Sequence, residues 1–388
     1  MRIDPRAETA RYIDSLGAET LEKASSYTAG NHWLLLWGLL VSALVAWLIV
    51  RWGVLNRIQA KLANRRVAAR AMVVGGTYVL ISSLLSLPWS IYSGWWRERQ
   101  YGRSSQPFAD YLMQNGIGLA ITVVLGALFL AALYWLINRT GRRWWVWSGG
   151  LVAGALAFMM LVSPIAIEPL FNRYEPVPAG PVRDALVEMA SRADIPEDRL
   201  FMFDGSRQSN NFTANVSGVF GSARIAISDV AMKQASLDEV KAVTGHEIGH
   251  YVLGHVWWMI IVFSLLAMLV FFLVDRLFPS FAGAFGSDAE LGEPRGLPVL
   301  AFMGSLVLLL AMPLTNTLSR TLETQSDQYS LRTVNEPDGL ASALVKTAEY
   351  RYPRPHPLQE AIFYTHPSVE RRVRRAMEWK AAHAGERQ

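Results

Sequence analysis

The chain contains no cysteine among its 388 residues. Disulfide bonds, thiolate metal ligands and a cysteine nucleophile are therefore excluded. The absence does not identify a compartment, because a chain without cysteine suits either side of a membrane. Any metal ion that this protein binds must be held by histidine and carboxylate side chains.

Charge is also scarce: 18% of the residues are charged and 52% are hydrophobic, which is too apolar for an ordinary soluble enzyme of this length. Six runs of about 18 or more residues contain no Asp, Glu, Lys or Arg, and each can cross a hydrocarbon core roughly 30 Å thick as a helix. Lipid offers backbone polar groups no partner, so the runs are predicted to be helical. They are 33–50, 71–91, 117–138, 147–167, 256–274 and 297–315.

The order of apolar and polar segments predicts a mainly α, polytopic membrane-helix bundle of about six spans whose soluble mass is split in two. The first soluble segment contains one amphipathic helical pattern and three short strand patterns separated by Gly, Ser and Asn, which predicts a small sheet. The helix is expected at 180–195 and the strands at 198–204, 211–219 and 223–229. The predicted divisions are 1–168 with four spans, 169–255, 256–315 with two spans, and 316–388.

The sequence HEIGH carries the first chemical signal. Ser236 and Glu239 have the spacing of a capping box, which predicts a helix that starts there and runs on into the fifth span. On that helix His246 and His250 lie one turn apart on one face, where they can bind a single Zn²⁺ ion. Glu247 would then stand beside the open metal position and take a proton from the attacking water. The alternative is an ordinary pair of surface or core histidines.

A second signal, ETQSD, follows the sixth span. Glu323 and Asp327 lie four residues apart on one helix face. Catalytic zinc takes three protein ligands, often two His and one Glu, so Glu323 would complete the set and Asp327 would orient a ligating imidazole. With these ligands the two soluble segments form a zincin-like α+β catalytic portion holding one Zn²⁺ per chain. A solvated helix face would show the same spacing, so that reading remains open.

These residues resemble the type I CAAX prenyl endopeptidases, membrane zinc metalloproteases related to bacterial heat-shock membrane proteases. HEIGHYVLGH, including His255, is similar to that family's zinc-binding helix, and ETQSD to its E-x-x-x-D element. THPSVERR resembles a third element, which implies that His366 and Arg372 face the substrate and the developing oxyanion. The resemblance also implies seven spans, of which the first has no counterpart among the six runs.

The segment 205–229 resembles the family's edge strand, which implies that an extended substrate binds along the strand near 212–220. Thr213 and Ala214 stand where the family has Asn and Ala, and Asn215 follows; a turn role for Asn215 remains an alternative. The implied partner is a peptide or protein, specifically a prenylated C-terminal peptide cut after the modified cysteine. A bacterial homologue would instead degrade misfolded membrane proteins.

Two other classes of protein compete with this reading. An intramembrane site-two-type protease would use the acid of Asp338-Gly339, but its HExxH would have to lie within an apolar span, and a polar stretch precedes this one. The second alternative is a non-catalytic transporter or scaffold. Transporters usually place ionisable groups inside their spans, however, and none of the six runs contains one.

The expected surroundings are a lipid bilayer, with no nucleic-acid partner, because no basic patch with interleaved aromatics is present. We expect a multi-pass protein of the bacterial inner membrane rather than the endoplasmic reticulum. The connectors 51–70 and 139–143 contain basic residues and no acid, and the positive-inside rule would place them in the cytoplasm. The family resemblance implies the reverse orientation, and we expect the catalytic side to be cytoplasmic.

Overall fold

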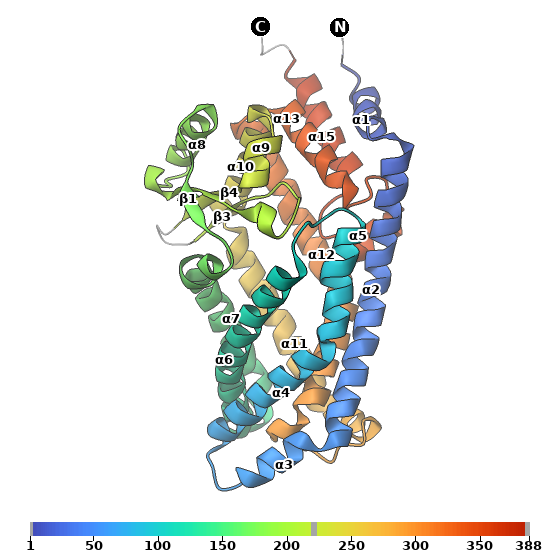
Figure 1. Ribbon diagram of the computed structural model, residues 1–388, viewed down its shortest axis with the longest axis vertical. Helices are drawn as coiled ribbons and strands as arrows, with labels where there is room; N and C mark the ends of the chain where they lie inside the picture. The colour runs from blue at the N-terminus through green and yellow to red at the C-terminus, as the bar shows by residue number, and fades with distance from the viewer. Residues whose placement is uncertain (1–2, 219–222, 385–388) are drawn as a thin grey trace.

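The computed structural model describes residues 3–218 and 223–384. Figure 1 shows an elongated molecule in which a bundle of long helices carries a smaller α/β portion at the end where both termini lie. Within these described residues, five continuous helical stretches are long and apolar enough to cross a membrane, and together they contain all six predicted runs. The third stretch, Phe108–Leu170, contains two of the runs.

The long helices are separated by turns whose sequence explains them. Within the third stretch, Gly141 adopts φ +53°, and this conformation ends one helix and lets the chain fold back into the next.

The long helices confirm the prediction of a mainly α membrane bundle. The long helices are α2 (Gly17–Trp52), α4 (Val67–Ile91), α6 (Phe108–Thr140), α7 (Trp144–Val162), α11 (His255–Ala284) and α12 (Leu297–Thr333).

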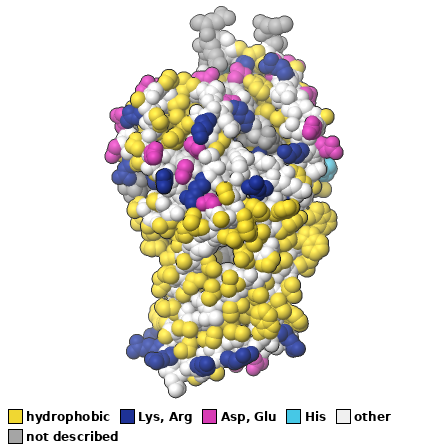
Figure 2. Space-filling view, in the orientation of Figure 1, with side chains coloured by type: hydrophobic (Ala, Val, Ile, Leu, Met, Phe, Trp, Pro, Cys, Tyr) yellow, Lys and Arg dark blue, Asp and Glu magenta, His cyan; other side chains and the backbone are white. Residues whose placement is uncertain are grey.

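Hydrophobic side chains cover the outside of this bundle. Figure 2 shows a broad apolar band across the lower part of the molecule, with charged side chains gathered above it and at its lower end. Large exposed hydrophobic residues supply the band, which is the surface that lipid would cover. They include Leu36, Leu40, Leu44, Leu84, Val124, Leu128, Leu265 and Leu310.

The soluble portion combines short helices with one four-stranded sheet in the order β1-β2-β4-β3. Its strands are β1 (Tyr174–Pro176), β2 (Leu200–Phe203), β3 (Ala214–Ser217) and β4 (Arg224–Ser228), so the three predicted strands are present and β1 is an addition. β3 pairs antiparallel with β4 and forms one edge of the sheet. The shorter helices are α1 (Pro5–Asp14), α3 (Val54–Lys61), α5 (Arg97–Gln100), α8 (Pro181–Ser191), α9 (Asp229–Gln234), α13 (Pro337–Lys346), α14 (Pro357–Phe363) and α15 (Val369–Ala382).

The helix that carries HEIGH is α10 (Leu237–Val252), and it begins with the predicted capping box between Ser236 and Glu239. It does not continue into the fifth span, so that prediction is wrong. Gly254 adopts the left-handed conformation with φ +64°, which breaks the helix before α11 begins at His255. α10 and α11 are therefore two separate helices, and the HEIGH sequence lies on the first of them.

Close packing fixes α10 against α12. A β-carbon placed on Gly249 would lie 3.1 Å from Cβ of Tyr329 and 3.2 Å from Cα of Ser326, which is closer than most such contacts, so glycine favours this approach. The hydroxyl of Ser330 also donates a hydrogen bond of 2.7 Å to the carbonyl of Ala242. These contacts bring the middle of α10 beside the soluble end of α12.

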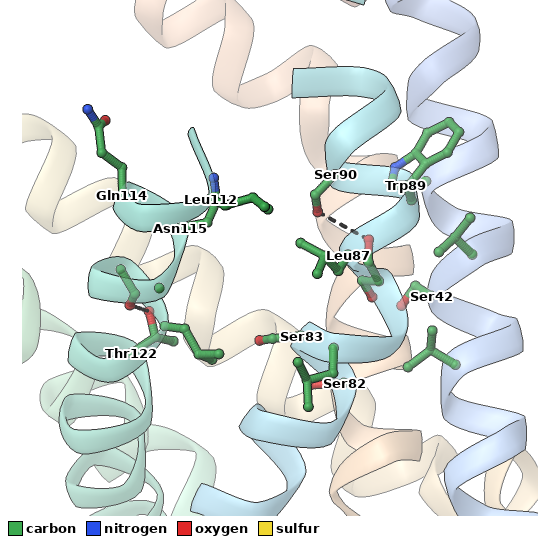
Figure 3. Close-up of a pocket in the computed structure, with 18 of the residues that line it drawn as sticks. Ser42, Ser82, Ser83, Leu87, Trp89, Ser90, Leu112, Gln114, Asn115 and Thr122 are labelled. Carbon is green, nitrogen blue, oxygen red and sulfur yellow. Dashed lines mark hydrogen bonds between the residues drawn. The ribbon is translucent and has the colours of Figure 1, made fainter. Parts of the chain in front are cut away.

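A cavity of about 810 Å³ lies among α2, α4 and α6. Figure 3 shows hydroxyl groups on its walls, with Ser82, Ser83 and Ser90 on α4 and Thr122 on α6. The bundle is therefore hollowed by a partly polar space, a feature that the sequence leaves undetermined.

Candidate metal centre and catalytic pocket

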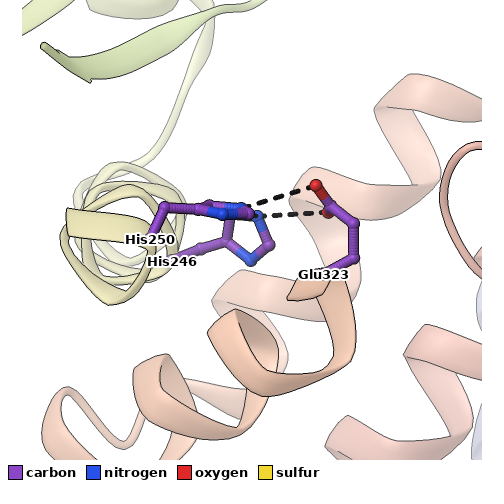
Figure 4. A group of neighbouring side chains, drawn as sticks. All are labelled: His246, His250 and Glu323. Carbon is purple, nitrogen blue, oxygen red and sulfur yellow. Dashed lines mark hydrogen bonds and ion pairs between the residues drawn. The ribbon is translucent and has the colours of Figure 1, made fainter. Parts of the chain in front are cut away.

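Three ligating side chains meet where α10 packs on α12. Figure 4 shows His246 and His250 projecting from α10 toward the carboxylate of Glu323 on α12. Nε2 of His246 lies 3.3 Å from Glu323 Oε2, Nε2 of His250 lies 3.4 Å from Oε1, and the two Nε2 atoms are 3.1 Å apart. One ligand atom from each residue lies within 4.8 Å of the others. The structure thus brings together the three residues that the sequence predicts as ligands.

Asp327, one turn beyond Glu323, orients the first imidazole. Its Oδ1 accepts a hydrogen bond of 3.0 Å from Nδ1 of His246, which turns Nε2 toward the cluster. Burial lowers the pKa of His246, but the hydrogen bonds with Asp327 and Glu323 outweigh it and raise that pKa to about 10. The surroundings of this imidazole therefore favour positive charge, which a bound cation can supply instead.

His255 gives the second imidazole a matching partner. Nδ1 of His250 lies 2.9 Å from Nδ1 of His255, and Nε2 of His255 lies 3.0 Å from Oε1 of Gln325. The amide oxygen can only accept, so Nε2 of His255 carries the proton and its Nδ1 accepts from His250. Nε2 of His250 then keeps its lone pair for the cluster. The sequence pointed to His255 only through resemblance, and it gave no indication of Gln325.

The donor set fits a zinc ion. Two Nε2 ligands at the usual zinc distance and tetrahedral angle would lie about 3.3 Å apart, close to the 3.1 Å found here. Oε2 of Glu323 is buried and receives no hydrogen bond from the described residues. Its charged neighbours are Nε2 of His246 at 3.3 Å and Nη2 of Arg372 at 3.5 Å. A divalent cation between the three ligand atoms would give this oxygen a direct bond.

Glu247 lies beside the cluster, in a pocket of about 310 Å³ that the three ligand residues also line. Burial raises the pKa of its carboxyl group above the ordinary value, although the nearby histidines act in the opposite direction. A carboxylate with a raised pKa in a cleft is suited to accept a proton near neutral pH.

His366 and Arg372, which the resemblance implies face the substrate, line the same pocket. Nε2 of His366 lies 3.2 Å from Glu323 Oε1, and burial together with the charge of Arg351 lowers the pKa of His366 to about 3. Its imidazole is therefore neutral at pH 7. Arg372 is buried on α15, and its Nη2 donates to Oδ1 of Asp327 at 2.6 Å.

Only part of the predicted substrate strand lies at the pocket. Phe212, Thr213 and Ala214 line the pocket, whereas Asn215 does not. Thr213 is anchored by a hydrogen bond of 2.9 Å from the backbone N–H of Ser228 to its carbonyl oxygen. Residues 219 and 220 of the expected strand lie outside the described residues.

Two further residues of this pocket were missed by the sequence analysis. Tyr350 and Arg351 line it from the segment that follows α13. The stretch Ala348–Arg351 reads as the end of an amphipathic helix before a proline-rich connector, so neither spacing nor composition marks these two side chains.

An HExxH helix, a glutamate ligand and a membrane-helix bundle together define a membrane metallopeptidase. Residues 176–380 match the model of Peptidase family M48, and residues 7–173 match the model described as CAAX prenyl protease N-terminal, five membrane helices. The chain belongs to peptidase family M48, whose zinc chemistry the donor set fits.

Relatives support the same assignment. The uncharacterized metalloprotease YhfN of Bacillus subtilis is 27% identical over 310 residues, covering 78% of this chain and 72% of the relative. The CAAX prenyl protease 1 homolog of Arabidopsis thaliana is 29% identical over 300 residues, or 76% of this chain and 70% of the relative. The CAAX prenyl protease 1 of Saccharomyces cerevisiae is 26% identical over 359 residues, or 87% and 76%.

A solved structure shares the fold. The crystal structure of S. mikatae Ste24p superposes with a TM-score of 0.77 at 22% identity, covering 93% of this chain and 89% of that chain.

The chain is a multi-pass membrane zinc metalloprotease that acts on peptide or protein, and neither the site-two-type reading nor the transporter reading is favoured.

Proposed function

We propose that this protein is an endopeptidase in which His246, His250 and Glu323 hold one Zn²⁺ and an extended peptide binds along β3. The observation that carries the proposal is the convergence of three ligating atoms within 4.8 Å of one another. Zinc in such a set is a Lewis acid that makes water nucleophilic near neutral pH. The catalytic work is divided between the soluble segments 169–255 and 316–388, each joined to membrane spans.

Glu247 is the proposed general base. Glu247 lines the pocket beside both histidines. The pKa of its carboxyl group is raised, which makes the carboxylate a better proton acceptor near neutral pH. It accepts a proton from the attacking water and returns it to the amine that leaves. Asp327 has the supporting role of keeping the His246 ring in place through its hydrogen bond.

His366 and Arg372 are the proposed oxyanion donors. Nδ1 of His366 lies 2.8 Å from the hydroxyl of Thr365, which can donate to it, so that Nε2 carries the proton of the neutral ring. Nε2 faces Glu323 at 3.2 Å, on the pocket side of the cluster. Donors placed there stabilise negative charge that develops on the carbonyl oxygen only in the transition state.

The peptide is proposed to add as a strand beside Thr213 and Ala214, with Asn215 in the same strand. β3 pairs on one side only, with β4, and its first residue lies at the pocket wall. An edge strand offers unpaired backbone groups to an extended chain, which gives binding without strong sequence preference. Several relatives are named CAAX prenyl proteases, and we propose a prenylated C-terminal peptide as the specific substrate to test.

For location, we propose a bacterial inner membrane with the catalytic portion in the cytoplasm. The rival orientation rests on the positive-inside rule, because basic side chains gather at the end of the bundle away from the catalytic portion (Figure 2). The chain has no native cysteine, so single cysteines at the exposed positions Ala60 and Glu378 can be labelled selectively. An impermeant reagent added to intact cells should label Ala60→Cys and spare Glu378→Cys; the opposite pattern refutes the proposed orientation.

Hydrolysis of matched peptides tests the proposed activity. The purified protein should cleave a farnesylated C-a-a-X peptide, lose that activity in chelator, and regain it with added zinc. Glu247→Gln should keep its zinc and lose hydrolysis by about a hundredfold or more. Equal cleavage by Glu247→Gln and the parent contradicts the base assignment. Equal rates of cleavage of farnesylated and unmodified peptides would contradict the proposal that a prenylated peptide is the specific substrate.

A further inference from the structure

Arg351 has no anionic side chain paired with it among the described residues, whereas three nearby arginines do. Arg354 pairs with Glu370 at 3.0 Å, Arg371 with Glu360 at 3.3 Å, and Arg372 with Asp327 at 2.6 Å. Among the residues that the structure describes, the guanidinium group of Arg351 forms no hydrogen bond and no ion pair. The centroid of the Tyr350 ring lies 5.9 Å from the Cζ atom of Arg351, which is a weak cation–π contact at most.

This side chain lies in the wall of the pocket that contains His246, Glu247 and Glu323. Neither carboxylate of the pocket pairs with it, and Glu323 is directed at the imidazole cluster instead. Arg351 is partly buried, and this burial lowers the pKa of its guanidinium group. Removing a cation from water without an anionic partner is costly, so a group kept in this state at a binding site is suited to an anion that arrives with the ligand.

The ligand of this pocket is a peptide, and the anions that a peptide carries are carboxylates. A guanidinium group has five donors in a planar arrangement that matches both oxygens of a carboxylate. The neighbouring Arg372 has Nε and Nη2 taken by Asp327, so Arg351 is the better placed of the two to bind a substrate carboxylate.

We propose that Arg351 binds a carboxylate of the peptide substrate and so determines which peptides the site accepts. The inference rests on the proposed peptidase function and adds a specificity residue to it. Two sources share this chemistry, the free α-carboxylate at the end of the substrate and an acidic side chain near the scissile bond. We commit to the carboxylate as the recognised group, and the peptides below separate the two sources.

Binding without turnover tests this directly. Three fluorescent peptides that differ only at the C-terminal residue are titrated into the zinc-loaded, full-length Glu247→Gln variant: a free acid, its C-terminal amide, and an amide whose last residue is replaced by Asp. A charge-assisted pair predicts that the free acid binds about tenfold to a hundredfold more tightly than the amide. If the Asp-containing amide binds as tightly as the free acid, the side chain can serve as the source.

Adding Arg351→Gln to this background should abolish the difference between acid and amide while leaving the affinity for the amide unchanged, which also shows that the pocket is intact. Arg351→Lys should retain part of the preference, because it keeps the charge and loses the bidentate geometry. Arg371→Gln, an exposed arginine on α15, is the matched control and should keep the full preference. Equal binding of all three peptides to the Glu247→Gln protein, or a preference that survives Arg351→Gln, overturns the proposal. If the parent protein hydrolysed no peptide, the proposed peptidase function would be contradicted. The binding measurements on the Glu247→Gln protein could still be interpreted, because they do not depend on turnover.

Discussion

Arg372 and Asp327 form a buried, two-pronged ion pair, with Nε to Oδ2 at 2.8 Å and Nη2 to Oδ1 at 2.6 Å. The same Oδ1 accepts the hydrogen bond from Nδ1 of His246. One carboxylate thus connects a pocket arginine of α15 with a metal-site imidazole of α10. The proposed third zinc ligand, Glu323, lies one turn before Asp327 on the same helix, so the position of the proposed centre depends on this part of α12.

Asp327→Asn should weaken zinc binding about tenfold to a hundredfold, because the amide cannot neutralise Arg372 and holds the imidazole less firmly. Competition with a chromogenic chelator measures the change. Asp288→Asn is the matched control, since Asp288 is exposed and pairs only with Arg295 outside the site. Zinc affinity equal to that of the parent would show that Asp327 does not orient the centre.

His255→Ala should also weaken zinc binding by about tenfold or more, because Nδ1 of His250 loses its acceptor and the ring can turn. Gln325→Ala should have a smaller effect in the same direction, since His255 then loses only its own orienting partner. His383→Ala provides the control: that ring stacks on Trp379 at the end of α15 and does not line the pocket. Unchanged zinc affinity in His255→Ala contradicts the assigned role.

The sequence predicted the elements of this enzyme that depend on local pattern. Runs without charge predicted the membrane helices, and the spacings of His246 with His250 and of Glu323 with Asp327 predicted the residues that meet in the cluster. The break at Gly254 escaped prediction because a glycine within a helical pattern is compatible with both a continuous and an ended helix. Gln325 and Arg351 were not predicted for another reason. The role of Gln325 depends on its contact with His255, and that of Arg351 on the absence of an anionic partner among the described residues. The spacing of residues along the sequence does not indicate either property.

Gly249→Val should separate α10 from α12 and reduce zinc affinity without altering a ligand. The added β-carbon would stand 3.1 Å from Cβ of Tyr329 and 3.2 Å from backbone Cα of Ser326, so α12 must yield by a few tenths of an ångström, and the two methyl groups of valine add to the overpacking. Gly304→Val on α12 is the comparison, because no atom lies within 4 Å of the added carbon there. If both variants bound zinc as the parent does, the close helix approach would have no part in forming the site.

Acid should remove a stabilising ion pair at the start of α10. Burial acts to raise the pKa of Glu239, but hydrogen bonds from Lys346, Ser342 and the backbone of Ser236 outweigh it and hold the pKa below its ordinary value of 4.5. Because the folded-state pKa is the lower one, the stabilisation is complete above about pH 4.5 and is lost as pH falls through the folded value.

Glu239→Gln should therefore lower the apparent melting temperature by a few degrees at pH 7, about 2–4 °C for each kcal/mol lost, and the gap to the parent should narrow below pH 4.5. Glu188→Gln is the control, since Glu188 is exposed and pairs with Arg192 on the surface. Melting curves in detergent at the two pH values measure the gap. A gap of the same size at both would rule out the charge of Glu239 as its cause.

The zinc content of the detergent-purified protein tests the central claim most directly. Mass spectrometry of the metal should find about one zinc per chain in the parent and a small fraction of that in Glu323→Gln, which keeps the shape of the side chain and removes the anionic ligand. A parent without zinc, or a Glu323→Gln variant that retains a full equivalent, would contradict the assignment of His246, His250 and Glu323 as the metal centre.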